Sequence, residues 1–241
     1  MSMDTREHVG PAGIGSGAYT LFEAARIIRV PYQKLRRWAS GYWYVDEDEE
    51  RFSTAVVPDM DDDSDERILS FYELMELFVI GFFRRQGVSM QVIRATRVIA
   101  QRTFNTEYPY ATQRLETDGS GIFAELPTAF ELHVPEKRLT IELSKSQITF
   151  DRIVRPFFRE LDFDQGLAYR YWPMGRSEPV ILDARRSFGR PIVESRGIPT
   201  YALFNMVESG EDRATVASWY RVTADELNSA IEYEKTLLRA A

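Results

Sequence analysis

The sequence predicts an α+β protein that is mainly α-helical, with a helical N-terminal domain, a connector that contains β-strands, and a small C-terminal domain of three helices. Apolar residues recur at helical spacing through residues 18–102, lose that spacing between 104 and 150, and regain it near the C-terminus. The chain has 241 residues, of which 44% are hydrophobic and 28% are charged. This composition is that of a globular protein with room for two domains.

These changes in pattern also place the domain boundaries. We expect a flexible tail over 1–17, a first domain over 18–102 with an acidic insert at 46–66, a connector over 103–165 and a C-terminal domain over 166–241. No run of about 18 apolar residues is present, and the N-terminus lacks the apolar stretch of a signal peptide. We therefore expect a cytoplasmic protein that does not bind membranes.

The first predicted helix begins after Thr20. The side chain of Thr20 can cap the helix, and Glu23, three residues later, completes a capping box. Val30 and Pro31 end this helix, and Pro31 suits the first turn of a second one. The apolar face of the first helix consists of Leu21, Ala24, Ala25 and Ile28.

The second helix, residues 32–40, turns Leu35 and Trp38 inward and leaves a basic outer face. A short helix with such a face fits the major groove of DNA. The candidate DNA contacts are Gln33, Lys34, Arg36 and Arg37, with Tyr42 and Arg51 as further candidates. The same two helices could also serve only dimerisation, because capped helix pairs occur in many domains that never bind DNA.

The order Tyr-Thr at 19–20, Glu-Ala-Ala at 23–25 and Leu-Arg-Arg-Trp at 35–38 resembles the MerR-type winged helix-turn-helix. The resemblance covers residues 18–102. It implies a small β-wing after the second helix and then a helix rich in Leu and Phe. We expect the two wing strands at 42–45 and 67–69.

The insert between these strands departs from that family. Residues 46–66 contain eleven acidic residues and one basic residue, Arg51, for a local charge of −10. The whole chain carries −7, so the remainder sums to −7 + 10 = +3, which does not exclude nucleic acid as a partner. The insert is either a solvated loop or a segment that binds a basic partner and competes with phosphate. Its aspartates, Asp59 and 61–63, lack the spacing of a calcium loop.

Two more helices follow the insert. Ser70 is placed to cap the first and Ser89 the second, with Gly87 ending the first. The apolar positions are Phe71, Leu74, Leu77, Phe78 and Phe82 in the first helix and Val92, Ile93, Thr96, Ile99 and Ala100 in the second. We expect Arg94, Arg97 and Arg102 on the solvated faces.

The connector is predicted to be rich in β-structure. Gly119 and Gly121 suggest a turn, and we expect strands at 122–126, 130–134 and 139–143. A helix should follow over 147–161, with Ile148, Ile153, Val154, Phe157 and Phe158 inward. His133 has no second ligand at metal-binding spacing, so we interpret it as structural.

In the C-terminal domain we expect a buried strand at 180–183 and three helices, at 200–209, 211–220 and 223–238. Thr200 and Thr223 are candidate caps, and Gly189 and Gly197 should supply positive φ. The last helix shows Asp225, Glu226, Glu232 and Glu234, which would repel DNA, so these helices favour dimerisation or partner contact. Trp219, Tyr220 and Tyr233 could anchor an interface, with an aromatic core the favoured interpretation for Trp219.

The succession Phe-Gly-Arg-Pro at 188–191, Gly-Ile-Pro-Thr at 197–200, Val-Ala-Xaa-Trp-Tyr at 216–220 and Ala-Ile-Xaa-Tyr-Glu at 230–234 resembles the VapB-like antitoxins. The resemblance implies a homodimeric antitoxin that neutralises a PIN-type ribonuclease toxin and represses its own operon by binding operator DNA. Because PIN-type nucleases hold metal with clustered acids, antitoxin arginines are candidate toxin contacts. These are Arg176, Arg185, Arg186, Arg190 and Arg196.

Catalysis is not indicated. The sequence has two histidines, His8 and His133, no cysteine and no phosphate-binding glycine loop, so we expect neither an enzyme nor a bound cofactor. The alternative functions are a stand-alone MerR-like transcriptional regulator and a dimeric protein-interaction module without DNA binding. Operator binding should weaken steeply with salt, whereas an apolar protein interface should not.

Overall fold

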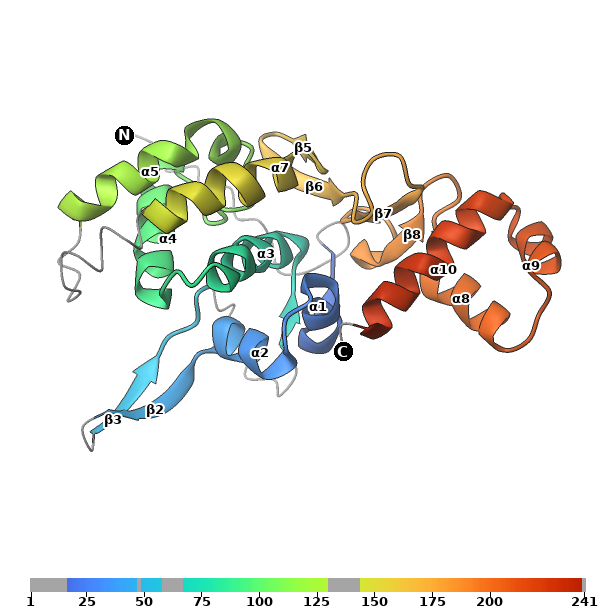
Figure 1. The fold of residues 1–241 in the computed structure, drawn as a ribbon, viewed down its shortest axis with the longest axis horizontal. Coiled ribbons are helices and arrows are strands. Elements are labelled where there is room, and N and C mark those ends of the chain that lie inside the picture. Colours follow the sequence, from blue (N-terminus) through green and yellow to red (C-terminus); the bar gives the residue numbers. More distant parts are fainter. Residues whose placement is uncertain (1–16, 47–48, 58–66, 130–143, 240–241) are drawn as a thin grey trace, which may run out of the picture.

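The computed structural model describes residues 17–46, 49–57, 67–129 and 144–239 and shows an α+β protein that is mainly helical, as predicted (Figure 1). The predictions for His8, Asp59, residues 61–63 and His133 lie outside these residues, as do the predicted strands at 130–134 and 139–143. No helix within the described ranges is both long enough and apolar enough to cross a bilayer.

Two helices of the N-terminal domain begin from one short ribbon. Strand β1 (Tyr19–Thr20) pairs antiparallel with β4 (Ile68–Leu69), and each strand leads directly into a helix. These helices are α1 (Leu21–Ile28) and α3 (Phe71–Arg85). Both start with a capping box: the one at Thr20 and Glu23 was predicted, and at the second helix the predicted cap Ser70 is joined by Glu73. Four backbone N–H groups that would otherwise lack partners are thereby satisfied.

The second helix, α2 (Tyr32–Ser40), follows a tight turn. Arg29 adopts a left-handed conformation with φ 59° and ends α1, and Pro31 is the N-cap of α2 rather than its first residue. Leu35 and Trp38 are buried, as the helical spacing predicts. The apolar faces of the two helices of this motif, α1 and α2, therefore pack against each other and against α3.

A β-hairpin follows α2 where the resemblance implies a wing, and we call this hairpin the wing, but its strands differ from those that we predicted. Strand β2 (Tyr42–Asp46) pairs with β3 (Glu49–Ser53), inside the acidic insert, and the predicted partner at 67–69 instead contributes β4 to the ribbon with β1. A two-residue connection joins β2 to β3. Because closing so short a loop costs little conformational entropy, the local hairpin is favoured over pairing across the whole insert.

Helix α4 (Met90–Phe104) begins at the predicted cap, Ser89. Arg97, which we predicted on a solvated face, is buried instead, and its Nε lies 2.6 Å from Oε2 of Glu76 on α3. The other carboxylate oxygen of Glu76 accepts from the N–H of Tyr110 at 2.6 Å, and Arg97 Nη2 donates to the carbonyl of Glu107 at 2.7 Å. This ion pair joins α3, α4 and the loop that follows.

The connector is helical where we predicted a strand at 122–126. Helix α5 (Arg114–Ala129) runs through that segment and packs on α4. Gly119 is not in a turn but in this helix, and a Cβ at this position would overlap the ring of Phe150. The glycine lets two helical segments approach closely, which its local sequence does not reveal.

The helix predicted at 147–161 extends from 144 to 158. It comprises a helix over 144–149, a wider π-helical turn η1 (Phe150–Val154) and α7 (Arg155–Phe158). Val154, Phe157 and Phe158 are buried as predicted, whereas Ile148 is 55% exposed.

A five-stranded antiparallel sheet follows, with its strands in chain order. The strands are β5 (Leu161–Asp164), β6 (Leu167–Tyr171), β7 (Val180–Asp183), β8 (Pro191–Val193) and β9 (Ile198–Pro199). The predicted strand at 180–183 is β7 and is fully buried. A short 3-10 turn, η2 (Ser187–Gly189), lies between β7 and β8. Gly189 and Gly197 have φ values of 78° and 70°, as predicted.

Three helices complete the chain: α8 (Thr200–Glu208), α9 (Arg213–Tyr220) and α10 (Ala224–Arg239). The capping prediction for Thr223 is confirmed by its hydrogen bonds with Glu226. Thr200 is not a cap, because it is the first residue of α8 and its buried hydroxyl lies 2.5 Å from Oε1 of Glu234. Glu234, predicted to be exposed, is therefore buried.

The aromatic predictions for this region are partly reversed. Trp219, for which we favoured a core position, is 59% exposed, whereas Tyr233, a candidate interface anchor, is buried. The packed apolar core beneath the three helices is made by Leu203, Val216, Leu227 and Ile231.

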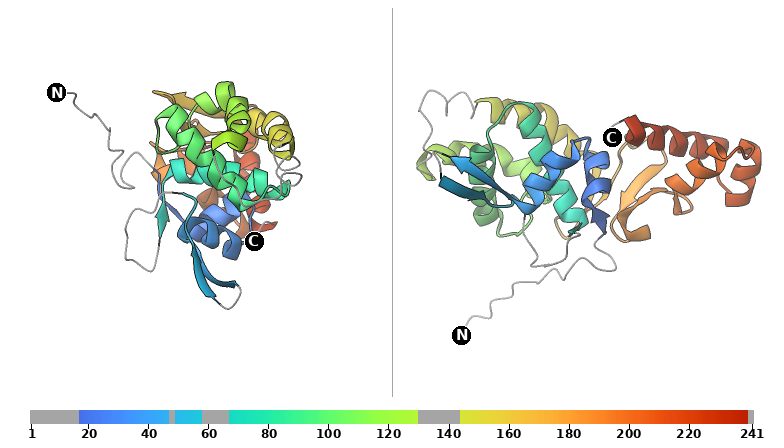
Figure 2. Two further views of the ribbon diagram at one scale, coloured as in Figure 1. Left: turned by 90° about the vertical axis from the view of Figure 1, so that its left-hand side faces the viewer. Right: turned by 90° about the horizontal axis from the view of Figure 1, so that it is seen from below.

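The C-terminal helix α10 contacts α1. Figures 1 and 2 show an elongated molecule with the wing at one end, α9 at the other, and the C-terminal end of α10 beside α1. The hydroxyl of Tyr19 donates to the carbonyl of Gly189 at 2.6 Å, and the N–H of Ala18 donates to the carbonyl of Phe188 at 2.9 Å. Burial raises the pKa of Tyr19 well above its ordinary value, so the phenol stays a neutral donor.

Replacing Tyr19 with Phe should therefore destabilise the junction between the domains. The change leaves the carbonyl of Gly189 without its buried donor, which costs about 1–3 kcal/mol of unfolding free energy. Urea denaturation measures the loss, with Tyr201→Phe as a matched control because Tyr201 is 44% exposed. Equal stability of both variants would show that the junction does not depend on this bond.

Candidate nucleic-acid interface

Helix α2 presents an exposed basic face to solvent. Gln33, Lys34, Arg36 and Arg37 are all exposed, on the side opposite the buried Leu35 and Trp38. Within the described part of the chain, none of these three cations forms an ion pair. The positive charge of the helix is therefore not neutralised and is available to an anionic partner.

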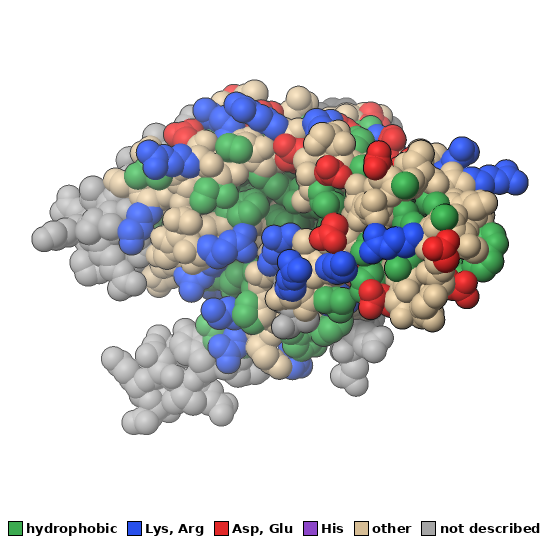
Figure 3. All heavy atoms as spheres, turned by 45° about the vertical axis from the view of Figure 1, so that its right-hand side comes forward, with side chains coloured by type: hydrophobic (Ala, Val, Ile, Leu, Met, Phe, Trp, Pro, Cys, Tyr) green, Lys and Arg blue, Asp and Glu red, His purple; other side chains and the backbone are tan. Residues whose placement is uncertain are grey.

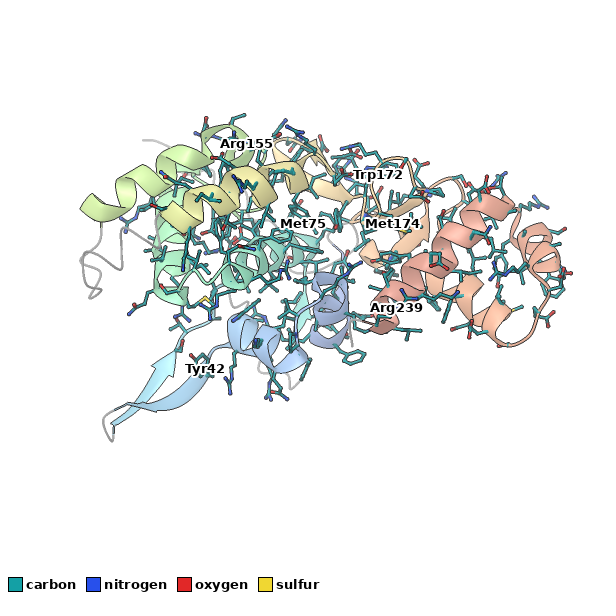
Figure 4. All side chains as sticks on the ribbon, in the orientation of Figure 1. Tyr42, Met75, Arg155, Trp172, Met174 and Arg239 are labelled. Carbon is teal, nitrogen blue, oxygen red and sulfur yellow. The ribbon has the colours of Figure 1, made fainter. Side chains whose placement is uncertain are left out.

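Tyr42 extends this face toward the wing. It lies where α2 passes into β2, as Figure 4 shows, and is 38% exposed. The guanidinium of Arg37 lies over its ring, 5.3 Å from the centroid. This cation–π contact restricts Arg37 to fewer conformations before it meets a ligand.

The base of the wing is fixed to the domain by residues that we did not predict. Nη2 of Arg94 on α4 donates to Oγ of Ser53 at 2.8 Å and to the carbonyl of Thr54 at 2.6 Å. The N–H of Val56 donates to the carbonyl of Trp38 on α2 at 2.8 Å, and Val56 and Val57 are buried. The two valines could have revealed this attachment from the sequence, because they are apolar residues in an otherwise acidic insert.

The wing itself carries little positive charge. Arg51 lies on β3, opposite Tyr44 in the register, and its side chain is outside the described part of the structure. Asp46, Glu49 and Glu50 lie on the same two strands. Because such acids repel phosphate, the positive charge of this candidate interface is concentrated in α2.

Replacing Arg94 with Ala should loosen the wing while leaving α2 intact. The variant loses two charge-assisted hydrogen bonds, so amide hydrogen exchange in β2 and β3 should accelerate and affinity for target DNA should fall about tenfold. Arg102→Ala, at an exposed position of the same helix, is the control. Unchanged exchange in the wing would contradict the role given to Arg94.

Four of the five C-terminal arginines predicted as toxin contacts form hydrogen bonds or an ion pair with other residues of this chain. Arg176 donates to the carbonyls of Arg159 and Leu161, and Arg196 donates to the carbonyl of Arg221. Arg185 pairs with Asp164, and Arg186 donates to the carbonyl of Glu194. Arg190 is exposed and its side chain makes no hydrogen bond or ion pair with a described residue.

The C-terminal helices differ from α2 in charge. The exposed residues of α10 include Asp225 and Glu232, and Asp212 caps the N-terminus of α9. Phosphate would be repelled by this surface. The candidate nucleic-acid interface is therefore in the N-terminal domain.

Comparisons with known proteins agree with this division. Residues 17–96 match the family described as "Putative DNA-binding HTH domain", and residues 180–233 match that described as "Protein of unknown function (DUF433)". The chain is 29% identical, over 227 residues, to the Mycobacterium tuberculosis protein named "Putative antitoxin VapB45", covering 89% of this chain and 92% of that protein.

A solved structure is similar as well. The crystal structure of Rv2018 from Mycobacterium tuberculosis has a TM-score of 0.65 and 26% sequence identity, and the match covers 88% of this chain and 96% of that one. By these similarities the chain is antitoxin-like, and its N-terminal third resembles a helix-turn-helix DNA-binding domain.

Proposed function

We propose that this chain is an antitoxin that neutralises a PIN-type ribonuclease toxin and binds operator DNA to repress its own operon. One observation carries the proposal: an exposed basic helix without ion-pair partners among the described residues lies in a chain similar to a named antitoxin over 89% of its length. The basic helix supports the DNA-binding function, and the similarity supports the toxin-binding function.

The DNA function uses α2 as the recognition helix of a MerR-like winged domain. An α-helix with its side chains is about 10–12 Å in diameter, which suits a major groove about 12 Å wide. Arg36 and Arg37 contact bases or phosphates, with Gln33 and Lys34 beside them and Tyr42 and Arg51 at the wing. A homodimer places two such helices in successive grooves, so the operator is an inverted repeat with half-sites spaced by whole helical turns.

The toxin function falls to the C-terminal part of the chain. Arg190 is exposed and has no internal partner among the described residues, so it is the most available proposed contact. Arg176, Arg185, Arg186 and Arg196 would have to exchange an internal partner for the toxin. Trp219, 59% exposed at the end of α9, is a suitable apolar anchor.

Co-expression with the product of the neighbouring gene tests the toxin function. A complex that survives size-exclusion chromatography is the expected result. DNase footprinting of the upstream region tests the DNA function, and an inverted repeat should be protected. Protection without a complex would instead support a stand-alone regulator.

A further inference from the structure

Three arginines gather where α1, α3 and α10 meet. Arg29, at the end of α1, is exposed. Nη1 of Arg85 donates to the carbonyl of Ile28, the residue before Arg29, at 3.4 Å, and burial, with the nearby charge of Arg29, lowers the pKa of Arg85. Arg26, one turn earlier, donates a long hydrogen bond of 3.4 Å to the carbonyl of Leu237, and its guanidinium lies 5.9 Å from the ring centroid of Phe22. None of the three forms an ion pair with a described residue, so their charges reinforce one another.

An aromatic cluster lies beside these arginines. The guanidinium of Arg85 lies 5.0 Å from the ring centroid of Phe82, Phe82 contacts Phe157, and Phe157 contacts Tyr171, each at 5.2 or 5.3 Å. Tyr171 in turn interacts electrostatically with Arg29. Figure 3 shows this face of the molecule, where a row of Lys and Arg side chains borders a hollow lined by hydrophobic side chains.

A buried hydroxyl completes the cluster. Tyr233 on α10 is 2% exposed, and its Oη has no hydrogen-bond partner among the described residues. Its charged form would interact with Arg26 and Arg29, and burial raises the pKa of Tyr233 well above its ordinary value. The phenol is therefore a neutral donor, and a buried donor without a partner is costly unless a ligand accepts from it.

The nearby acids leave this charge largely in place. Glu234 is buried and accepts a hydrogen bond from Thr200; burial raises its pKa, and the charge of Arg26 opposes that rise, so Glu234 offsets part of the charge of Arg26 but not that of Arg29 and Arg85. Glu160 interacts with Tyr171 and makes no ion pair with the three arginines. The cluster thus keeps a positive surplus beside an apolar surface.

We propose that Arg29 and Arg85, backed by Arg26 and Tyr233, form a docking site for an acidic segment of the toxin. The inference rests on the proposed function and adds a second contact, on the N-terminal domain. A partner carboxylate would accept hydrogen bonds from the two guanidinium groups, and apolar residues beside it would cover Phe82 and Tyr171. Charge-assisted bonds at a partly desolvated site are the kind that dominate protein interfaces.

A protein partner fits this site better than a nucleic acid does. Bases bind to aromatic side chains by stacking on a free ring face, but here Phe82 is covered by Arg85 and Tyr171 packs on Phe157 and Phe78. The wing, which would accompany duplex DNA, projects at the end of the molecule away from α10 (Figure 1).

Charge reversal tests this site. The variant Arg29→Glu/Arg85→Glu is compared with the wild type and with Arg102→Glu/Arg152→Glu, which changes the same net charge at exposed arginines elsewhere. Titration calorimetry with the ribonuclease from the neighbouring gene should show at least a hundredfold loss of affinity for the first variant. The control should lose less than threefold. Thermal melting of both variants, followed by circular dichroism, reports on the integrity of the fold.

The single variant Arg29→Glu is included in case the double variant misfolds, because Arg29 is exposed and makes no packing contact like that of Arg85 with Phe82. Its affinity for the ribonuclease should fall about tenfold. If Arg29→Glu and Arg29→Glu/Arg85→Glu both bind the ribonuclease with wild-type affinity, this inference alone is overturned. A wild type that binds no ribonuclease would overturn both it and the proposed toxin function. If the double variant lost binding to labelled single-stranded RNA while its affinity for the ribonuclease stayed unchanged, the site would be assigned to nucleic acid instead.

Discussion

Alanine at both Arg36 and Arg37 is expected to remove most operator binding. Each arginine should contribute on the order of 1–3 kcal/mol if it contacts a base, so the double variant should bind roughly 10²- to 10⁴-fold more weakly. Both side chains are exposed and lack ion pairs within the described chain, so their loss should leave the fold unchanged. Fluorescence anisotropy with labelled operator DNA measures the effect.

The salt dependence of the same titration distinguishes base from phosphate contacts. A lost phosphate contact lowers the slope of log affinity against log salt by about one, whereas a lost base contact lowers sequence discrimination. Lys145→Ala/Arg152→Ala removes two exposed cations far from α2 in sequence and should bind like the wild type. An unchanged affinity for operator in the Arg36/Arg37 variant would refute the assignment of α2 as the recognition helix.

Methionine in place of Arg97 is expected to destabilise the N-terminal domain more than any surface change. The substitution leaves Glu76 buried without its cation, and breaking a buried pair in this way costs about 3–5 kcal/mol. Burial already raises the pKa of Glu76, against the opposing effect of Arg97. Removing Arg97 should raise that pKa further.

The sign of the resulting pH dependence follows from this shift. A carboxyl whose pKa is raised by folding binds its proton more tightly in the folded state, so stability falls as pH rises from the unfolded pKa toward the folded one. Arg97→Met should therefore be less destabilised at pH 5 than at pH 8 in urea denaturation. Glu76→Gln/Arg97→Met should recover part of the loss, and Arg102→Met serves as the control. A small, pH-independent effect would contradict a charged buried pair.

The helix starts could be predicted from the sequence because capping is local. Thr20 with Glu23, Ser70 with Glu73, and Thr223 with Glu226 are each three residues apart, and their hydrogen bonds form within that span. The basic face of α2 is local for the same reason, since its inward and outward residues alternate within nine positions. These parts of the fold and of the candidate site needed no tertiary information.

Errors arose where distant residues decide the structure. Gly119 suggests a turn by itself, but it lies in α5 because the ring of Phe150 packs where a Cβ would be. Arg97 looks like a solvated cation until Glu76, on the preceding helix, is brought against it. Arg94 likewise holds the base of the wing only because it bonds to Ser53 and Thr54, which lie about forty residues earlier in the chain.

The central claim is that this chain silences a ribonuclease, and inhibition of RNA cleavage tests it most directly. The ribonuclease encoded by the neighbouring gene would be assayed on a labelled RNA while the purified chain is added in increasing amounts. We predict that cleavage falls to background at a fixed molar ratio, and that Arg29→Glu/Arg85→Glu requires a large excess. Cleavage that continues at the full rate in the presence of saturating wild-type chain would contradict the account.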